Sequence, residues 1–354
     1  MNLLEAQLDY AFADTLPEIG HTFEVAPGVR WLRMGLPFAL NHINLWLLED
    51  SIETENGVQK GWTIVDCGIS DDVTRAGWET IFATQLQGLP ILRVLVTHCH
   101  PDHVGLADWI CARWQAPLWM STGEYLSARI MSAALPGADG SAMLPHFQAH
   151  GMNDPEVIAK VSQRKSYYPT LVPNVPHAYH RLHDQQQVVI GAHTWRVITG
   201  FGHAPEHVAL YCADLDVLIS GDMVLPRIST NVSVFAIAPE SNPVQQYLDS
   251  LEKYRDLPIT TLVLPSHGKP FRGLHTRIDQ LNDHHRDRLA EVAEACRVPQ
   301  SASDIVPMMF PRALDPHQMT FALGEALAHL HKLWFDGVLV RRLDADKVYR
   351  FQTH

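Results

Sequence analysis

Hydrophobic and polar residues follow two periods along most of this chain. Short runs rich in valine, isoleucine, leucine and tryptophan predict strands at residues 21–36, 42–50, 62–68, 91–98 and 116–121. Apolar residues at helical spacing predict helices at residues 71–86 and 104–114. This alternation of strands and helices is typical of layered α/β proteins.

A helical segment interrupts the alternation at residues 122–182. Helices are predicted at residues 122–135, around 143–151 and at 154–165, separated by proline and glycine breaks. We interpret the segment as an inserted helical cap. Strands resume at residues 185–200 and 207–222, and a helix at 243–257 precedes a last strand at 260–267.

The end of the chain has its own pattern. A charged helix from about residue 278, helices at 301–310 and 316–337, and a ribbon at 338–352 predict three helices with a two-stranded wing. We therefore expect a catalytic domain at residues 1–275 and a winged-helix-like module at 276–354. His284 and His285 are expected on a solvated face of the charged helix.

Composition narrows the class of protein. With 354 residues, 46% of them hydrophobic, the chain can bury a large core, and its net charge of −12 disfavours nucleic acid and anionic membranes as partners. Acidic residues near the amino terminus do not fit a secretory signal, and no stretch approaches the ~20 apolar residues of a membrane span. Five scattered cysteines favour reduced thiols. We expect a cytoplasmic protein without a membrane partner.

The stretch LVTHCHPDHVG, at residues 95–105, carries an unusual concentration of polar groups directly after a strand. In extended backbone His98 and His100 point the same way, while Cys99 points elsewhere. Asp102 and His103 follow the rigid Pro101 and can address a second point nearby. Imidazole and carboxylate groups ligate zinc and similar ions, so this loop predicts a metal site.

Three later strand ends supply further groups of the same kind. They are His203 in GFGH, Asp222 in LISGD and His267 in LVLPSHG. Loops at strand ends can turn their side chains toward a common cleft. With 21 histidines in the chain some coincidences are expected, but the ordered set disfavours an ordinary polar surface loop.

The series HxHxDH, GH, GD and SHG, over roughly residues 22–275, resembles the metallo-β-lactamase-fold hydrolase superfamily. The resemblance implies an αββα sandwich in which two mixed sheets face each other. It assigns His98, His100 and His203 to one metal. It assigns Asp102, His103 and His267 to a second, with Asp222 bridging both. Asp66 matches the family's early aspartate, which orients the site from behind.

Several roles remain open at the level of sequence. His207 fits either a residue supporting the ligands or an ordinary buried histidine. Two divalent cations, with zinc favoured and manganese or iron as alternatives, would activate water for hydrolysis. Asp102 is also expected to take up a proton. Tyr167 or Tyr168 is a candidate oxyanion donor, with simple aromatic packing as the alternative.

The substrate is the least determined feature. The acidic chain and the apolar side chains of the cap favour a small-molecule carboxylic ester, thioester or lactone; these side chains are Met131, Leu135, Met143, Leu144 and Phe147. The alternatives are an RNA phosphodiesterase and a mononuclear iron persulfide dioxygenase. The first follows from GDMVLPRISTNVSV and the final module, which resemble the subgroup of β-lactamase-like protein 2.

The charge of the final module weighs against RNA. Its acidic and basic residues are nearly balanced, and its long helix carries almost no positive charge; the basic residues near the wing are Arg341, Arg342, Lys347 and Arg350. We expect this module to act as a dimerisation or cleft-wall element instead.

Overall fold

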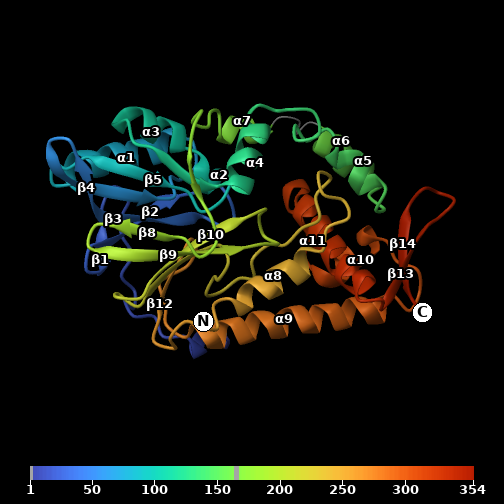
Figure 1. Ribbon diagram of the computed structural model, residues 1–354. Helices are drawn as coiled ribbons and strands as arrows, with labels where there is room; N and C mark the ends of the chain where they lie inside the picture. The colour runs from blue at the N-terminus through green and yellow to red at the C-terminus, as the bar shows by residue number, and fades with distance from the viewer. Residues whose placement is uncertain (1–2, 163–166) are drawn as a thin grey trace.

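The computed structural model describes residues 3–162 and 167–354, and it places two β-sheets face to face with helices on the outside (Figure 1). The αββα sandwich expected from the resemblance is therefore present. Helix α1 (Asp72–Thr84) and helix α3 (Ala107–Trp114) cover one side, and α8 (Pro243–Glu252) and α9 (Leu274–Ala295) cover the other.

The first sheet contains seven strands in the order β1-β2-β3-β4-β5-β6-β7, antiparallel from β1 to β4 and parallel from β4 to β7. Its strands are β1 (Phe23–Ala26), β2 (Val29–Gly35), β3 (His42–Thr54), β4 (Gly57–Val65), β5 (Ile91–Leu95), β6 (Leu118–Ser121) and β7 (His180–Leu182). The first loops of the candidate site follow the ends of its parallel strands.

The second sheet contains five strands in the order β12-β11-β10-β9-β8, of which only β11 and β12 run parallel. Its strands are β8 (Gln187–Ile190), β9 (His193–Gly200), β10 (His207–Cys212), β11 (Val217–Gly221) and β12 (Leu262–Pro265). A separate hairpin pairs β13 (Leu339–Leu343) with β14 (Tyr349–Thr353).

The remaining helices are short except in the C-terminal module. They are a 3-10 helix (Glu5–Gln7), α2 (Pro101–Val104), α4 (Thr122–Ser132), α5 (Met143–Gln148), α6 (Pro155–Ser162), α7 (Tyr167–Leu171), α10 (Ala302–Met309) and α11 (Pro316–Phe335). The predicted helix at 154–165 corresponds to α6, and its residues 163–165 lie outside the described part of the chain.

Three hydrophobic clusters hold the layers together. Between the sheets, Trp31 and Trp46 of the first sheet pack with Trp195 and Leu210 of the second. Another cluster joins the outer face of the first sheet to α1 and α3. Each large side chain removed from water in this way contributes about 1.5–3 kcal/mol of transfer free energy.

The third cluster extends across the predicted domain boundary. It joins the outer face of the second sheet to α8, α9, α10 and α11, and it also includes side chains from the cap. Phe351 of β14 and Tyr247 of α8 both lie fully buried within it. The C-terminal module thus shares one apolar core with the sandwich.

Most of the apolar cap residues pack against the hydrophobic clusters of the core. Phe147 is 2% exposed in the third cluster, and Met143 and Leu144 pack against the same cluster. Met131 packs against the outer cluster of the first sheet, and Leu135 alone is 47% exposed. An apolar stripe indicates that one face of a helix is buried, but it does not indicate which part of the protein packs against that face.

The prediction that His285 lies on a solvated helix face is wrong. His285 has no exposed surface, and its Nδ1 lies 3.2 Å from Nε2 of His329 on α11. Burial lowers the pKa of His285 to about 2, so the ring is neutral. His284 is half-buried beside it. Charged residues surround this pair in the sequence, but in the structure α9 and α11 pack against each other here.

Within residues 3–162 and 167–354, no helix is both long enough and apolar enough to span a bilayer.

Candidate metal centre

The loop after β5 brings its histidines into contact with each other. Nε2 of His98 lies 2.9 Å from Nδ1 of His100, while the Cys99 side chain is buried against the outer cluster of the first sheet. This is the alternation predicted for extended backbone. Pro101 then starts the short helix α2, which carries Asp102 and His103.

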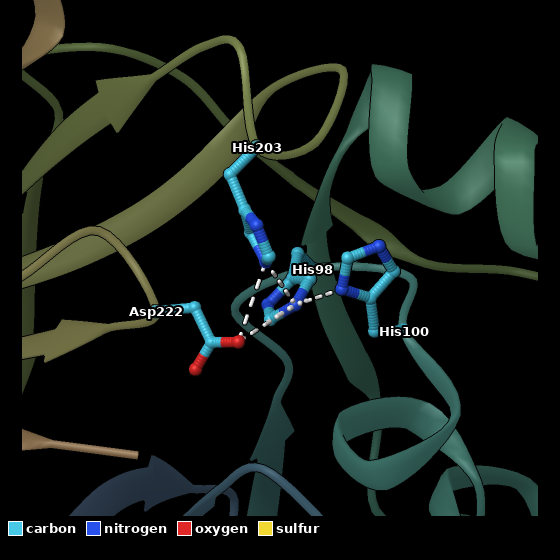
Figure 2. A group of neighbouring side chains, drawn as sticks. All are labelled: His98, His100, His203 and Asp222. Atoms are coloured by element: carbon cyan, nitrogen blue, oxygen red, sulfur yellow. Dashed lines mark hydrogen bonds and ion pairs between the residues drawn. The ribbon is translucent and has the colours of Figure 1, made fainter. Parts of the chain in front are cut away.

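A first group of ligand-type atoms forms where this loop meets the second sheet (Figure 2). The group consists of His98, His100, His203 and Asp222, whose ligand-type atoms all lie within 4.8 Å of one another. Nε2 of His203 lies 3.3 Å from both Nε2 of His98 and Oδ2 of Asp222. Figure 2 shows His98 and His100 from the loop after β5 converging with His203 and Asp222, which come from two other loops.

A second group lies beside the first and consists of Asp102, His103 and His267. Nε2 of His267 lies 3.4 Å from Oδ2 of Asp102 and 3.4 Å from Oδ1 of Asp222. Oδ1 of Asp222 also lies 3.6 Å from Nε2 of His103. The two oxygens of the Asp222 carboxylate therefore face different groups.

The chemistry of these atoms fits bound cations. Nε2 of His103 and Oδ1 of Asp222 are buried, and neither has a hydrogen-bond partner among the described residues. Leaving buried polar atoms unpaired is costly unless another species satisfies them. Burial and neighbouring imidazoles also hold the pKa values of His98 and His100 well below the usual range, so both rings present lone pairs.

Asp66 supports the second group from behind. Its backbone has a φ of 62°, and its Oδ2 lies 2.8 Å from Nδ1 of His103, while Oδ1 accepts from the Thr97 N–H. Burial alone would lower the pKa of His103. The carboxylates of Asp66, Asp102 and Asp222 outweigh burial and raise this pKa to about 10. These carboxylates create a strongly cation-attracting environment.

His207 lies directly beneath Asp222. Its Nε2 accepts from the Asp222 N–H at 3.1 Å, and its ring centre is 4.9 Å from that of His98. A Cβ at Gly221, where φ is +52°, would be 2.3 Å from Nε2 of His207. Only glycine permits this approach.

The SHG loop is held by residues from β3. Nδ1 of His267 donates to the His42 carbonyl oxygen at 2.8 Å, and Gly268 N–H donates to Nε2 of His42. The Asn44 amide donates to the carbonyl oxygens of Pro265 and Gly268. His42 and Asn44 thereby fix the loop that carries His267.

The sequence reasoning missed Glu124. This fully buried carboxylate accepts from the Cys99 N–H at 2.8 Å and from the Glu206 N–H at 2.6 Å. The only sequence signal is the pattern Ser121-x-x-Glu124, which normally indicates a capping box. Ser121 does cap α4, but Glu124 instead connects the loop of His98 and His100 to the loop after His203.

The two tyrosines of α7 have different surroundings. The Tyr168 hydroxyl donates to the carbonyl oxygen of Cys99 at 2.5 Å, so its proton is engaged with the ligand loop. Burial, with the nearby Cys99 thiol and Glu124, holds the Tyr168 pKa well above its usual range. In this arrangement Tyr168 braces the loop. Tyr167 is 38% exposed, and its role as an oxyanion donor stays a prediction.

Comparison with known proteins covers both parts of the chain. The profile of the "Metallo-beta-lactamase superfamily" matches residues 52–267, and that of the "Metallo-beta-lactamase-like, C-terminal domain" matches residues 289–354. A crystal structure of a β-lactamase domain protein from Burkholderia ambifaria is 59% identical, with a TM-score of 0.94 over 100% of both chains.

Two curated proteins are more distant relatives. The probable metallo-hydrolase YqjP of Bacillus subtilis is 23% identical over 91% of this chain and 97% of its own length. A β-lactamase-like protein 2 homolog of Caenorhabditis elegans is 26% identical over 46% of this chain and 52% of its own length. From the profile match and the similarity over its full length, the chain belongs to the metallo-β-lactamase superfamily.

Proposed function

We propose that this protein is a hydrolase that uses two adjacent divalent cations to activate water. The proposed ligands are His98, His100, His203, Asp222, Asp102, His103 and His267. The observation that carries the proposal is the Asp222 carboxylate, because its Oδ2 faces the first group and its Oδ1 faces the second. A single carboxylate shared in this way suits a two-cation site.

The cations and the Asp102 carboxylate have separate roles in the proposed hydrolysis. Divalent cations bound there would lower the pKa of a water molecule toward ~7, so that hydroxide becomes available at neutral pH. The Asp102 side chain is 18% exposed, compared with 10% for Asp222, and is the more open of the two carboxylates. We assign to Asp102 the uptake of a proton during hydrolysis.

A carboxylic ester, thioester or lactone is the substrate class that we favour. The loop after Asp222 exposes Phe235 and Ile237, and Val234 N–H of this loop bonds to Gly324 of α11. Phe321, one turn before Gly324, is 41% exposed. Exposed apolar side chains on a loop that begins at a proposed ligand, and on the helix bonded to that loop, suit an acyl group.

Two of the four basic residues of the C-terminal hairpin argue against RNA as the substrate. Arg341 donates to Oε1 of Glu240 at 2.9 Å and lies over the Trp334 ring. Arg350 donates to Asp346 at 3.0 Å. These arginines are already paired with carboxylates, and pairing reduces the positive potential available to a phosphate backbone.

A substrate panel tests the proposal. Purified protein with its metal content determined is assayed on aryl esters, acyl thioesters, lactones, and single-stranded and structured RNA. We expect acyl hydrolysis that falls by at least ~100-fold in His203→Ala and Asp102→Ala. The exposed His21→Ala serves as the matched control and should retain wild-type activity.

Three outcomes would overturn parts of the proposal. RNA cleavage without acyl hydrolysis would replace the substrate class. One redox-active iron per chain, with oxygen consumption on a persulfide, would replace hydrolysis by dioxygenation. Wild-type activity in both variants would refute the ligand assignment.

A further inference from the structure

The loop between β11 and α8 depends on other elements for its shape. Residues 222–242 form neither a helix nor a strand, yet they begin with Asp222 at the candidate metal centre. Arg277 of α9 donates to the carbonyl oxygens of Leu225 and Ile228. The next part of the loop, around Asn231, is held by α11.

Asn231 contacts one of the proposed metal ligands through its backbone. Nδ1 of His203 donates to the Asn231 carbonyl oxygen at 2.8 Å. This bond fixes the ring so that Nε2 faces His98 and Asp222. A hydrogen bond on the second ring nitrogen sets both the tautomer and the orientation of a histidine ligand.

The side chain of Asn231 is anchored at both ends of its amide. Nδ2 donates to Oε2 of Glu325 on α11 at 3.3 Å, and Oδ1 accepts from the Ser233 hydroxyl at 2.9 Å. Val234 N–H donates to the Gly324 carbonyl oxygen at 3.1 Å. A Cβ at Gly324 would be 2.8 Å from the Ser233 Oγ, so α11 and the loop are in close contact.

The second group of ligands has different supports. His103 is held by Asp66, and His267 is held by the His42 carbonyl oxygen. Both supporting residues come from the first sheet and its connections. Among the described residues, these contacts therefore link α11 to His203 and not to His103 or His267.

We propose that Glu325 of the C-terminal module is a positioning residue for His203, acting through Asn231. The module would thereby set the cation affinity of the first group of ligands and leave that of the second group largely unchanged. This inference rests on the proposed function, because it takes His203 to be a metal ligand. It gives the C-terminal helices a role in the chemistry of the site.

The test measures cation affinity in the full-length protein by competition with a chromogenic chelator, using Zn²⁺ and Co²⁺. Glu325→Leu should weaken one of the two binding steps by about 10-fold to 100-fold. Glu325→Gln should remain within a few-fold of wild type, since its amide oxygen can still accept from Asn231. Glu294→Leu on the exposed face of α9 is the matched control.

Two variants that each lack one proposed ligand identify which cation-binding step is affected. In a His267→Ala background, Glu325→Leu should still weaken binding, whereas in a His203→Ala background it should have no further effect. Asn231→Ala provides an independent variant at the other end of the contact. It should reproduce the loss, and the double variant with Glu325→Leu should lose no more than either single change.

The possible failures are distinguishable. A wild-type protein that takes up no cation refutes the proposed function. A wild-type protein that binds cations, with Glu325→Leu equal to Glu294→Leu, refutes only the role of Glu325. Equal weakening of both steps, or equal loss in Glu325→Gln and Glu325→Leu, refutes positioning in favour of general destabilisation. If Glu325→Leu does not fold, unchanged binding in Asn231→Ala refutes the proposal and selective loss supports it.

Discussion

At the scale of single residues, the candidate centre depends on groups that contact the proposed metal ligands on the side facing away from the centre. Asp66 faces Nδ1 of His103, and His207 accepts from the backbone of Asp222. Both contacts leave the inward-facing atoms of the ligands free to point at the centre. Substitutions behind the ligands should therefore alter cation binding without removing any ligand.

Asp66→Asn should weaken the second group selectively. The amide keeps much of the shape of the carboxylate, but it removes the negative charge that faces His103. We expect a loss of about 10-fold to 100-fold in affinity for one cation, as found when supporting groups are removed from metal sites. Chelator competition measures it. Asp71→Asn, which keeps an oxygen to cap α1, is the control, and equal affinities in the two variants would contradict the role of Asp66.

Gly221→Ala should damage both the fold and the centre. The added methyl carbon would be 2.3 Å from Nε2 of His207 and would sit on a backbone with φ of +52°. Gly88→Ala is a matched control, because its φ is +76° but nothing lies within 4 Å. Denaturant unfolding should show about 1 kcal/mol of loss in the control and at least ~2 kcal/mol more in Gly221→Ala. Similar losses in the two variants would mean that His207 moves aside.

At the scale of elements, strand-end loops assemble the centre and buried side chains hold these loops together. Glu124 at the start of α4 contacts the Cys99 N–H in one loop and the Glu206 N–H in another. The first loop carries His98 and His100, and the second follows His203. One carboxylate thus sets the distance between two elements that are remote in sequence.

Glu124→Gln should reduce cation affinity in the first group. Its single amide oxygen cannot accept both N–H groups, so one buried donor loses its partner at a cost of about 1–3 kcal/mol. Unfolding experiments should show that loss, and chelator competition should show weaker binding of one cation. Glu79→Gln, an exposed partner of Arg113, is the control. An unchanged unfolding free energy would show that a water molecule replaces the lost acceptor.

The sequence predicts the elements better than the contacts between them. The alternation in LVTHCH correctly indicated that His98 and His100 lie on one side, because this depends only on local backbone geometry. Glu124 was missed because its local pattern indicates a helix cap. No periodicity links Asn231 to Glu325, since that contact depends on how two distant segments meet. The covered face of Phe147 was misread for the same reason.

Helix α11 should contribute a pH dependence to stability through Glu325. Burial raises the pKa of this carboxyl from 4.5 to about 7. The folded protein therefore holds the proton more tightly, and this stabilisation is complete below the unfolded pKa and is lost as the pH rises through the folded pKa. Relative to Glu325→Gln, the wild type should lose up to ~2 kcal/mol between about pH 5 and pH 8, a figure reduced for partial exposure.

Denaturant unfolding of metal-free protein at several pH values measures this difference. The free energy of unfolding of the wild type should fall relative to that of the glutamine variant as the pH rises. Parallel curves for the two proteins would mean that the Glu325 carboxyl titrates alike in the folded and unfolded chain.

At the scale of the whole molecule, the seven proposed ligands lie in the connections that follow strands of both sheets. Bound cations would connect the two halves of the sandwich across the centre. Anything that binds only the folded state stabilises it by mass action, by about 2.7 kcal/mol at a free concentration 100 times the Kd.

Removing the cations should therefore lower the Tm by several degrees. Thermal unfolding with and without a strong chelator measures the shift, and restoring Zn²⁺ should reverse it. An Asp222→Ala variant lacks the carboxylate shared by both groups and should respond much less. A shift of the same size in that variant would assign the chelator effect to another site.

The third hydrophobic cluster has a consequence for biosynthesis. Phe351 belongs to the same cluster as buried side chains of the second sheet and as Val224, two residues after Asp222. During translation, the strands and proposed ligands of the sandwich leave the ribosome well before Phe351. The outer apolar face of the second sheet is therefore exposed until the C-terminal module has been synthesised. A nascent chain at that stage should be a natural client for chaperones that bind exposed apolar segments.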